Sequence, residues 1–264
     1  MALPVYVVDA FADRPMTGNP AAVVPLETWL PEAVMQAIAA EMNLSETVFF
    51  APHGDGFDIR WFTPTLEVDL VGHATLAAGW VAFNRLAFKA TEARFIGRAG
   101  SLTVSRKGSG EAALLSMEMP ARIAKPCRAP PELARALGAA PVEVLAATHY
   151  LCVFADASVV RGLKPDMNLL ASLDKAAVIV TAHGDVEFDF VSRFFAPANG
   201  VPEDPVSGVS HCSLVPYWSR RLGKKNLVGR QVSQRGGTLV CEDRGDRITL
   251  DGTAALFLEG TLSI

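Results

Sequence analysis

One stretch of the sequence occurs twice, and this internal repeat constrains the fold more than any other feature. Residues Arg60–Thr75 read R-W-F-T-P-T-L-E-V-D-L-V-G-H-A-T, and residues Arg193–His211 read R-F-F-A-P-A-N-G-V-P-E-D-P-V-S-G-V-S-H. Each copy has an arginine, two aromatic residues, a small residue and a proline, then an acidic residue and a glycine that opens a helix. Such self-similarity at long spacing indicates that a whole domain has been duplicated.

Each repeat leads into a largely apolar stretch. His73–Phe83 is apolar on almost every face, so we expect a helix that is buried all round and runs through the middle of a curved sheet. The second stretch contains Pro216, which predicts a kink or break. The first N–H groups of a helix have no partner within it and carry its positive end. If the two halves face each other, the helix starts at Gly72 and Gly208 share one cleft that suits a carboxylate or an enolate.

The other local patterns predict both strands and helices. Strand composition predicts strands at Thr47–Phe50 and Phe57–Trp61, joined by a hairpin turn. Thr28 is the candidate cap of a helix over Pro31–Glu41, which has a proline in its first turn. The segment Pro120–Pro131 contains four prolines and is the candidate linker between the two halves.

Charge and hydropathy exclude several classes of partner. The formal net charge is −4 and lysine and arginine form no long run, so we expect neither nucleic acid nor an anionic membrane as a partner. No apolar stretch reaches the roughly 20 residues of a membrane span, and the N-terminus lacks the charged lead of a signal peptide. We therefore expect a cytoplasmic protein.

The sequence lacks the spacings of the common metal and cofactor sites. Four cysteines without a C-x-x-C pair, and histidines without H-E-x-x-H spacing, predict reduced thiols, no disulfide framework and no metal site. Neither glycine-rich nucleotide-binding motif occurs, so we expect no nucleotide cofactor. The segment Gly208–Cys212 lacks the second glycine of a nucleophile elbow, which argues against a serine hydrolase.

Glu46 is the residue best suited to acid and base chemistry. It lies between Leu44 and the apolar run Val48–Phe50, and an apolar setting favours a carboxyl group that exchanges protons near neutral pH. His73, at the start of the first buried helix, can bind substrate or shuttle a proton. The plainer interpretations are an exposed strand-edge glutamate and a core histidine.

Polar residues also precede or begin the helix of the second repeat. Asp204 can bind substrate or cap that helix, and Asp69, its counterpart in the first repeat, is expected to cap. Ser207 and Ser210 can donate hydrogen bonds to an anion or act as caps.

Taken in order, these segments resemble the PhzF-like family of phenazine biosynthesis proteins. The segments are V-D-A-F, G-N-P-A-A-V-V, N-L-S-E-T-V-F-F, R-W-F-T-P…V-D-L-V-G-H-A-T and E-D-P-V-S-G…H, and they span nearly the whole chain. The resemblance implies the diaminopimelate-epimerase fold, an α+β architecture of two pseudo-symmetric halves. Each half wraps a curved mixed sheet around a buried central helix. The expected N-terminal half is residues 1–119, rejoined by a terminal strand at about 256–264; the C-terminal half is residues 120–255, with the active site in the cleft between them.

The resemblance also implies an activity and a set of site residues. PhzF-like proteins are usually homodimers without metal or organic cofactor, and the type enzyme isomerises a dihydro-hydroxyanthranilate by moving a proton along a conjugated system. Its catalytic glutamate is matched by Ser45-Glu46, its Gly-His helix start by Gly72-His73, and its aspartate before proline by Asp204. The expected catalytic residues are therefore Glu46, His73 and Asp204. The expected substrate-binding residues are Asn19, Ser45, Gly72, Ala74, Ser207, Gly208 and Val209.

Two features depart from related enzymes. Val209 stands where the type enzyme has a serine, so a substrate hydroxyl contact is lost or is taken over by Ser207 or Ser210. The related two-thiol epimerases have a cysteine before each helix glycine, and here those positions are Val71 and Ser207. Racemisation by a pair of thiols is therefore not expected.

These observations lead to one hypothesis and two alternatives. The hypothesis is a cofactor-independent isomerase in which Glu46 removes a proton from a carbon of a small carboxylate substrate and returns it at another carbon. The first alternative is an epimerase or racemase that uses Glu46 and His73 as opposed bases. The second is a non-catalytic protein of the same fold that binds a metabolite.

Overall fold

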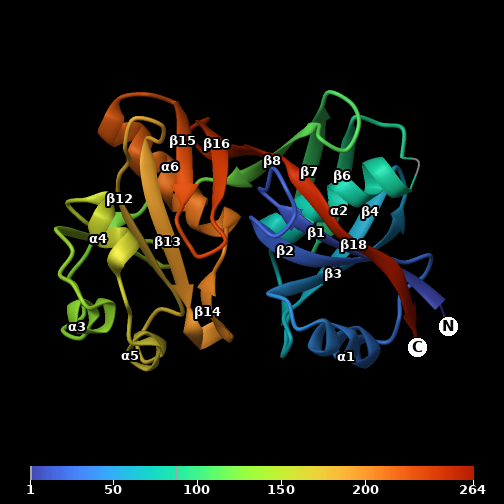
Figure 1. Ribbon diagram of the computed structural model, residues 1–264, viewed down its shortest axis with the longest axis horizontal. Coiled ribbons are helices and arrows are strands. Elements are labelled where there is room, and N and C mark those ends of the chain that lie inside the picture. Colours follow the sequence, from blue (N-terminus) through green and yellow to red (C-terminus); the bar gives the residue numbers. More distant parts are fainter. Residues whose placement is uncertain (1, 87) are drawn as a thin grey trace. The chain divides into compact units, whose positions relative to one another are not determined.

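The computed structural model describes residues 2–86 and 88–264, so residues 1 and 87 of the predicted N-terminal half lie outside the described residues. The chain forms two compact units (Figure 1). Unit 1 comprises Met1–Glu118 and Asp251–Ile264, and unit 2 comprises Met119–Leu250. The C-terminal strand β18 therefore belongs to the unit that contains the start of the chain.

Unit 1 is a mixed sheet curved around one helix. Its strands lie in the order β18-β1-β2-β3-β4-β6-β7-β8, with the short β5 paired to the end of β4, and the β2–β3 and β4–β6 pairs are parallel. The strands are β1 (Ala2–Ala10), β2 (Asn19–Pro25), β3 (Glu46–His53), β4 (Gly56–Phe62), β5 (Glu67–Val68), β6 (Glu92–Gly97), β7 (Gly100–Lys107), β8 (Leu114–Pro120) and β18 (Ala254–Ser263).

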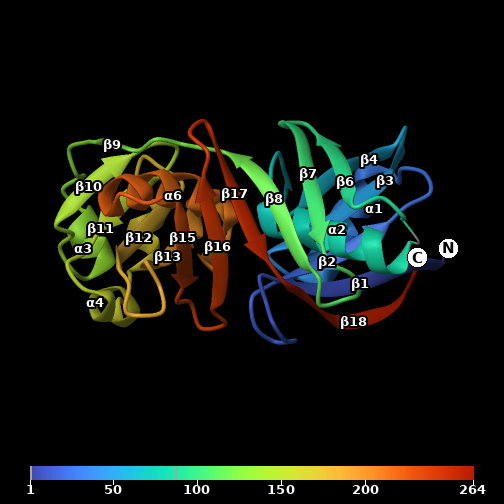
Figure 2. The same cartoon turned by 90° about the horizontal axis from the view of Figure 1, so that it is seen from above.

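The central helix α2 (Gly72–Arg85) is buried on every side, as its apolar sequence predicts. All residues from Gly72 to Phe83 are buried, and the helix packs against strands on both sides of the unit (Figures 1 and 2). Gly79 permits close packing against β7, because a Cβ atom there would lie 2.7 Å from Cγ1 of Val104.

Helix α1 (Glu32–Met42) covers the opposite face of the same sheet. Its apolar side packs on Val24, Phe49 and Phe62 in a second core. The helix begins after Pro31 and has no side-chain cap, so the prediction that Thr28 caps it is wrong. Thr28 lies three residues before Pro31, too far from the first turn of the helix to serve as its cap.

Unit 2 repeats the strand order of unit 1. Its order is β9-β10-β11-β12-β13-β15-β16, with β14 paired to β13, and the parallel pairs are β11–β12 and β13–β15. The strands are β9 (Lys125–Pro126), β10 (Glu143–Ala146), β11 (Tyr150–Val153), β12 (Val178–His183), β13 (Phe190–Ala196), β14 (Val201–Asp204), β15 (Asn226–Gln231) and β16 (Gly237–Asp243). Strand β17 (Arg247–Gly252) crosses the boundary between the two units along the chain.

One face of the unit 2 sheet packs on short helices and the other on α6 (Gly208–Leu222). The short helices are α3 (Leu133–Leu137), α4 (Ala157–Gly162), α5 (Met167–Ala171) and the 3-10 turn Pro197–Asn199. Among the described residues, no helix is both long and apolar enough to cross a membrane.

Helix α6 continues through Pro216, so the break that was one of the two predicted effects of this proline does not occur. A proline removes the hydrogen bond to the carbonyl four residues earlier, which here belongs to Cys212. The backbone N–H of Arg122 donates to that carbonyl over 2.8 Å. The polar group freed by Pro216 is therefore satisfied by a neighbouring segment, and the helix continues.

The internal repeat of the sequence is also a repeat of structure. In unit 1, Nε and Nη2 of Arg60 donate to the two carboxylate oxygens of Glu67 over 2.7 and 2.6 Å. In unit 2, the same atoms of Arg193 donate to Glu203 over 2.7 and 2.9 Å. Each glutamate lies five residues before the glycine that starts the central helix. The bidentate pairs thus fix the loop that leads into each helix.

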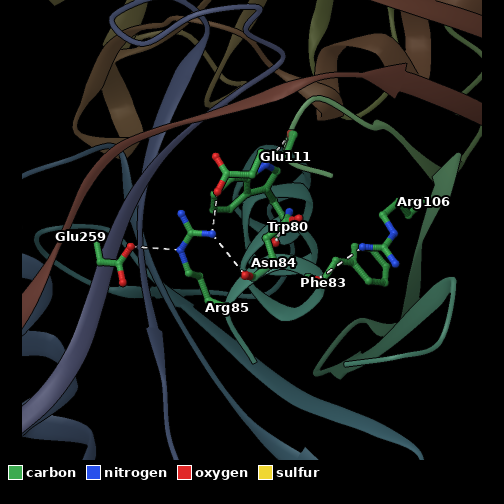
Figure 3. Close-up of polar contacts among 7 residues, drawn as sticks. All are labelled: Trp80, Phe83, Asn84, Arg85, Arg106, Glu111 and Glu259. Atoms are coloured by element: carbon green, nitrogen blue, oxygen red, sulfur yellow. Dashed lines mark hydrogen bonds and ion pairs between the residues drawn. The ribbon is translucent and has the colours of Figure 1, made fainter. Parts of the chain in front are cut away.

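A cluster at the far end of α2 fastens the C-terminal strand to the helix (Figure 3). Nε of Arg85 donates to Glu259 of β18 over 3.0 Å, and Nη1 donates to Glu111 over 2.8 Å. The guanidinium group also lies 4.9 Å from the ring centre of Trp80, whose Nε1 donates to the main-chain oxygen of Glu111. These contacts attach the end of the chain to the core of unit 1.

Candidate active site

Glu46 and His73 meet at the start of α2 in unit 1. Oε2 of Glu46 lies 3.2 Å from Nε2 of His73, and the side chains are 15% and 3% exposed. Glu46 is the first residue of β3, and His73 is the second residue of α2. Because α2 packs against β2 and β3, the helix start and the strand start lie together.

This contact is not an ion pair at neutral pH. Burial lowers the pKa of His73 to about 3, so its ring is neutral. The two atoms are within contact distance but lack the alignment of a hydrogen bond. A neutral imidazole beside a carboxyl group can accept or donate one proton, so the pair can exchange a proton after a small rotation of either side chain.

Asn19 lies on the same face of the sheet as Glu46. Ala21 and Glu46 are partners in the parallel β2–β3 pair, and Asn19 precedes Ala21 by two residues, so all three side chains point to the α2 side. Asn19 is fully buried at the start of β2. Ser45 is half-buried immediately before β3.

The N–H groups in the first turn of α2 receive no hydrogen bond from a capping side chain. The N-cap residue is Val71, which cannot accept a hydrogen bond through its side chain. Gly72 and Ala74 lie buried in that turn. Asp69 does not cap the helix, so that prediction is wrong. The helix start instead holds its positive end without a carboxylate cap.

The start of α6 in unit 2 is built differently. Oγ of Ser207 accepts from the backbone N–H of Ser210 over 3.1 Å, so Ser207 is a true cap, which was one of the two roles expected of it. The carbonyl of Ser207 accepts from Nδ1 of His211 over 2.7 Å. Gly208 is buried in the first turn, whereas Val209 is half-buried. Burial lowers the pKa of His211 to about 4, so it is neutral at neutral pH.

Asp204 does not occupy the position that the repeat suggested. In β14 it pairs with Phe194, one residue after the repeat arginine. In unit 1 the residue after the repeat arginine is Trp61, and its partner is Val68. The structural counterpart of Asp204 is therefore Val68 and not Asp69. Asp69 and Asp204 resemble each other because both are acidic residues shortly before the helix. The hydrogen-bonded register of the strands instead aligns Asp204 with Val68.

Gln231 is a polar residue of this region that the sequence did not reveal. It is fully buried at the end of β15. Its Nε2 donates to the carbonyl of Asp204 over 2.6 Å, and its Oε1 accepts from the backbone N–H of Ser207 over 2.9 Å. Gln231 thus braces the loop that leads to α6. A single glutamine at a strand end carries no spacing signal that could have indicated this role.

The predicted site residues form two groups, one in each unit. Asn19, Glu46, Gly72, His73 and Ala74 gather at the start of α2, with Ser45 beside them. The other group, at the start of α6, consists of Asp204, Ser207, Gly208 and Val209. That both groups face one cleft remains a prediction. Within the described residues, no three His, Cys, Asp or Glu side chains are grouped closely enough to hold a metal ion.

Comparisons with known proteins agree on one family. The family model described as "Phenazine biosynthesis-like protein" (PhzC-PhzF) matches residues 8–260. A relative from Pseudomonas aeruginosa named as an uncharacterized isomerase is 47% identical over 264 residues, which is 100% of both chains. The crystal structure of a PhzF-family phenazine biosynthesis protein from Enterococcus faecalis is 43% identical, with a TM-score of 0.94 over 100% of both chains.

More distant structures confirm the fold class. A hydroxyproline epimerase from Agrobacterium vitis matches 99% of this chain and 92% of its own, with a TM-score of 0.65 and 8% identity. At that identity the match shows the fold alone. The predicted α+β architecture of the epimerase type is thereby confirmed.

Proposed function

The chain belongs to the phenazine biosynthesis-like (PhzC-PhzF) family, and we propose that this isomerase moves a proton between two carbon atoms of a small carboxylate substrate. Glu46 is the general acid and base. The observation that carries the proposal is the 3.2 Å contact between Glu46 and His73 at the uncapped start of α2. It joins a base, a proton partner and a positive helix end in one place.

The proposed reaction begins with removal of a proton from a substrate carbon by the carboxylate of Glu46. The electron pair left behind spreads into the conjugated system as an enolate-like anion. The N–H groups in the first turn of α2 stabilise that charge. The carboxylic acid of Glu46 then returns the proton at another carbon. All electrons remain in the substrate, so the proposed step needs neither a metal nor an organic cofactor.

His73 assists this step as a neutral side chain. Its pKa of about 3 keeps the imidazole uncharged, so it does not form an ion pair with the substrate anion. As a neutral ring it orients Glu46 and passes a proton. The 3.2 Å contact also argues against Glu46 and His73 as opposed bases. Two opposed bases must lie on opposite faces of one substrate carbon, and a pair in direct contact leaves no room for that carbon.

Residues of unit 2 complete the proposal by holding the substrate. Asp204 orients the substrate and shares proton transfer with His73, and Ser207, Gly208 and Val209 bind the substrate from the start of α6. We also propose that the active enzyme is a cytoplasmic homodimer, in keeping with the family that the sequence resembles.

The test is exchange of hydrogen for deuterium in heavy water. The protein is incubated with a panel of small unsaturated and amino carboxylates, and deuterium at carbon is followed by NMR. The proposal predicts deuterium at two conjugated carbons of at least one compound. Deuterium at a single stereocentre with inversion would favour an epimerase. Binding of a compound without any exchange would contradict the proposal and favour a metabolite-binding protein.

A further inference from the structure

A short loop in unit 2 attracts two positive side chains. The loop Ala147–His149 joins β10 to β11, whose labels appear in Figure 2. Nη1 of Arg122 donates to Oγ1 of Thr148 over 3.2 Å, and Nζ of Lys175 donates to the carbonyl of Ala147 over 3.1 Å. Neither cation forms an ion pair with a carboxylate in the described part of the chain. Lys175 also lies 5.7 Å from the ring centre of Tyr150, and both cations are near enough to His149 to lower its pKa.

The third residue of this loop is a neutral histidine. The ring of His149 contacts the ring of Phe194, with 5.3 Å between centroids. Its Nδ1 is buried and has no hydrogen-bond partner among residues 2–86 and 88–264. Burial lowers the pKa of His149 to about 4, with further contributions from Arg122 and Lys175. A buried ring nitrogen without a protein partner can form one hydrogen bond with a ligand.

The repeat places His149 where unit 1 has its active-site strands. In unit 1, Glu46 lies three residues before Phe49, the partner of the repeat arginine, and is itself paired with Ala21. In unit 2 the equivalent of Glu46 is Ala177, three residues before the partner of Arg193. The backbone N–H of Tyr150 donates to Ala177 over 3.3 Å, so the preceding residue, His149, stands at the position of Ala21.

The face of the sheet also agrees. Phe195 and Tyr150 belong to the core between the sheet and the short helices. Successive side chains of a strand point to opposite faces, so their neighbours Phe194 and His149 point to the α6 side. Phe194 is in addition the strand partner of Asp204, one of the proposed catalytic residues. The ring of His149 therefore lies on the side of the unit 2 sheet that corresponds to the Glu46 side of unit 1.

We propose that Arg122, Lys175 and His149 form a binding site for a carboxylate group in unit 2, and that the substrate anchors a carboxylate there. The second part of this proposal rests on the proposed function, whereas the first does not. A carboxylate supplies the counter-charge that the two cations lack. It can also accept a hydrogen bond from the neutral ring of His149.

The site is tested by NMR of protein labelled at its five histidines. The spectrum of His149→Gln assigns the His149 signal. Acetate and then succinate are titrated into the wild-type protein at constant ionic strength, with sodium chloride as the control for screening. We expect a saturable shift of the His149 signal with succinate, and an increase in the pKa of His149 when succinate is bound. No saturable shift, or the same shift with chloride, overturns the proposal.

Matched variants locate the site. Arg122→Gln combined with Lys175→Gln should weaken succinate binding by about tenfold or more, because each removes a charge-assisted hydrogen bond. Arg128→Gln combined with Lys164→Gln removes two exposed charges of the same unit and should leave binding unchanged. Equal binding by both double variants overturns the proposal. If a variant folds poorly, the titration of the wild-type protein still decides whether the site exists.

A last comparison separates this site from the proposed reaction. Glu46→Gln should bind succinate at His149 as tightly as the wild-type protein, because Glu46 belongs to unit 1 and is no part of the site. If Glu46→Gln keeps full activity while the His149 shift persists, the proposed reaction fails and the carboxylate site stands. If the protein turns over substrate and no anion perturbs His149, the site fails and the reaction stands.

Discussion

The side-chain amide of Gln231 donates to the main-chain carbonyl of Asp204 over 2.6 Å, and its oxygen accepts the backbone N–H of Ser207 over 2.9 Å. One buried side chain thus spans the whole turn between β14 and α6. The equivalent position in unit 1 is Gly97, where a Cβ atom would lie 2.6 Å from the ring of Trp61. In unit 1 the glycine instead leaves room for the ring of Trp61, whose Nε1 donates to Oγ1 of Thr75 in α2 over 3.1 Å.

Gln231→Leu should disturb the second half of the site. It leaves the Ser207 N–H and the Asp204 carbonyl without their buried partner, which costs about 2 kcal/mol or more of unfolding free energy. The exchange rate of the folded variant should fall as well, because Asp204 loses its fixed position. Urea unfolding and the deuterium assay measure the two effects. The matched variant is Gln234→Leu at an exposed position, and equal behaviour of the two variants would refute the bracing role.

The stability of the protein should fall in mild acid because of its buried histidines. The pKa values of His73 and His211 are about 3 and about 4 in the folded state, below the unfolded value near 6.5. Between these values the unfolded chain binds protons that the folded chain does not. Their contribution is therefore complete above pH 6.5 and is lost as the pH falls, by about 2 kcal/mol per histidine at pH 5.

Urea unfolding at pH 7.5 and pH 5 measures this loss of stability. In His211→Gln the difference between the two pH values should be smaller than in the wild-type protein by about 2 kcal/mol. The same pH difference in both proteins would show that His211 is charged in the folded state or is exposed to water.

Arg193 should contribute more to stability than an ordinary surface charge. Its guanidinium group is 12% exposed, binds Glu203 twice and donates to the carbonyl of Leu163 over 2.8 Å. Arg193→Met leaves Glu203 without its partner and should lower the unfolding free energy by about 3 kcal/mol. Arg128→Met, at an exposed position, is the control in the same urea experiment. If Arg193→Met loses less than twice the unfolding free energy that Arg128→Met loses, this assignment is contradicted.

Val209 should limit which substrates bind at the start of α6. Val209→Ser adds a hydroxyl donor at a half-buried position in the first turn. If a substrate hydroxyl lies there, kcat/KM for hydroxyl-bearing carboxylates should rise by about fivefold, because one neutral hydrogen bond is worth about 1 kcal/mol. Val209→Ala shortens the side chain without adding a donor and should not show this gain. If kcat/KM rises in both variants, the smaller side chain and not a new hydrogen bond is the cause.

The sequence was sufficient for the fold because its signals agree at two levels. The repeat predicts two similar halves, and the all-apolar run after Gly72 predicts a helix buried on every side. The structure confirms that helix, and the comparisons confirm the fold class. The hairpin between β3 and β4 was predicted as well, because Gly54 and Asp55 sit between two apolar runs.

The wrong predictions have two physical causes. Pro216 does not break α6, because the N–H of Arg122 satisfies the freed carbonyl of Cys212, and that contact joins segments that are distant along the chain. Thr28 and Asp69 do not cap their helices, because they lie three and two residues before the N-cap residues Pro31 and Val71.

The candidate site was predictable only for the residues that belong to sequence motifs. Glu46 and His73 carry motif signals, and the structure brings them within 3.2 Å. Gln231 carries no motif signal, because its hydrogen bond to Asp204 joins segments that are distant along the chain. The proposed role of His149 rests on the register of β11 and β12, which becomes apparent only when the two units are compared strand by strand.

The most direct test of the central claim compares Glu46→Gln with Glu41→Gln in the deuterium exchange assay. Both substitutions remove one carboxylate of unit 1, but Glu41 is exposed on α1. The account predicts that Glu46→Gln loses about two to four orders of magnitude in exchange rate, with unchanged urea unfolding, and that Glu41→Gln retains the wild-type rate. Full activity in a folded Glu46→Gln protein would contradict the account.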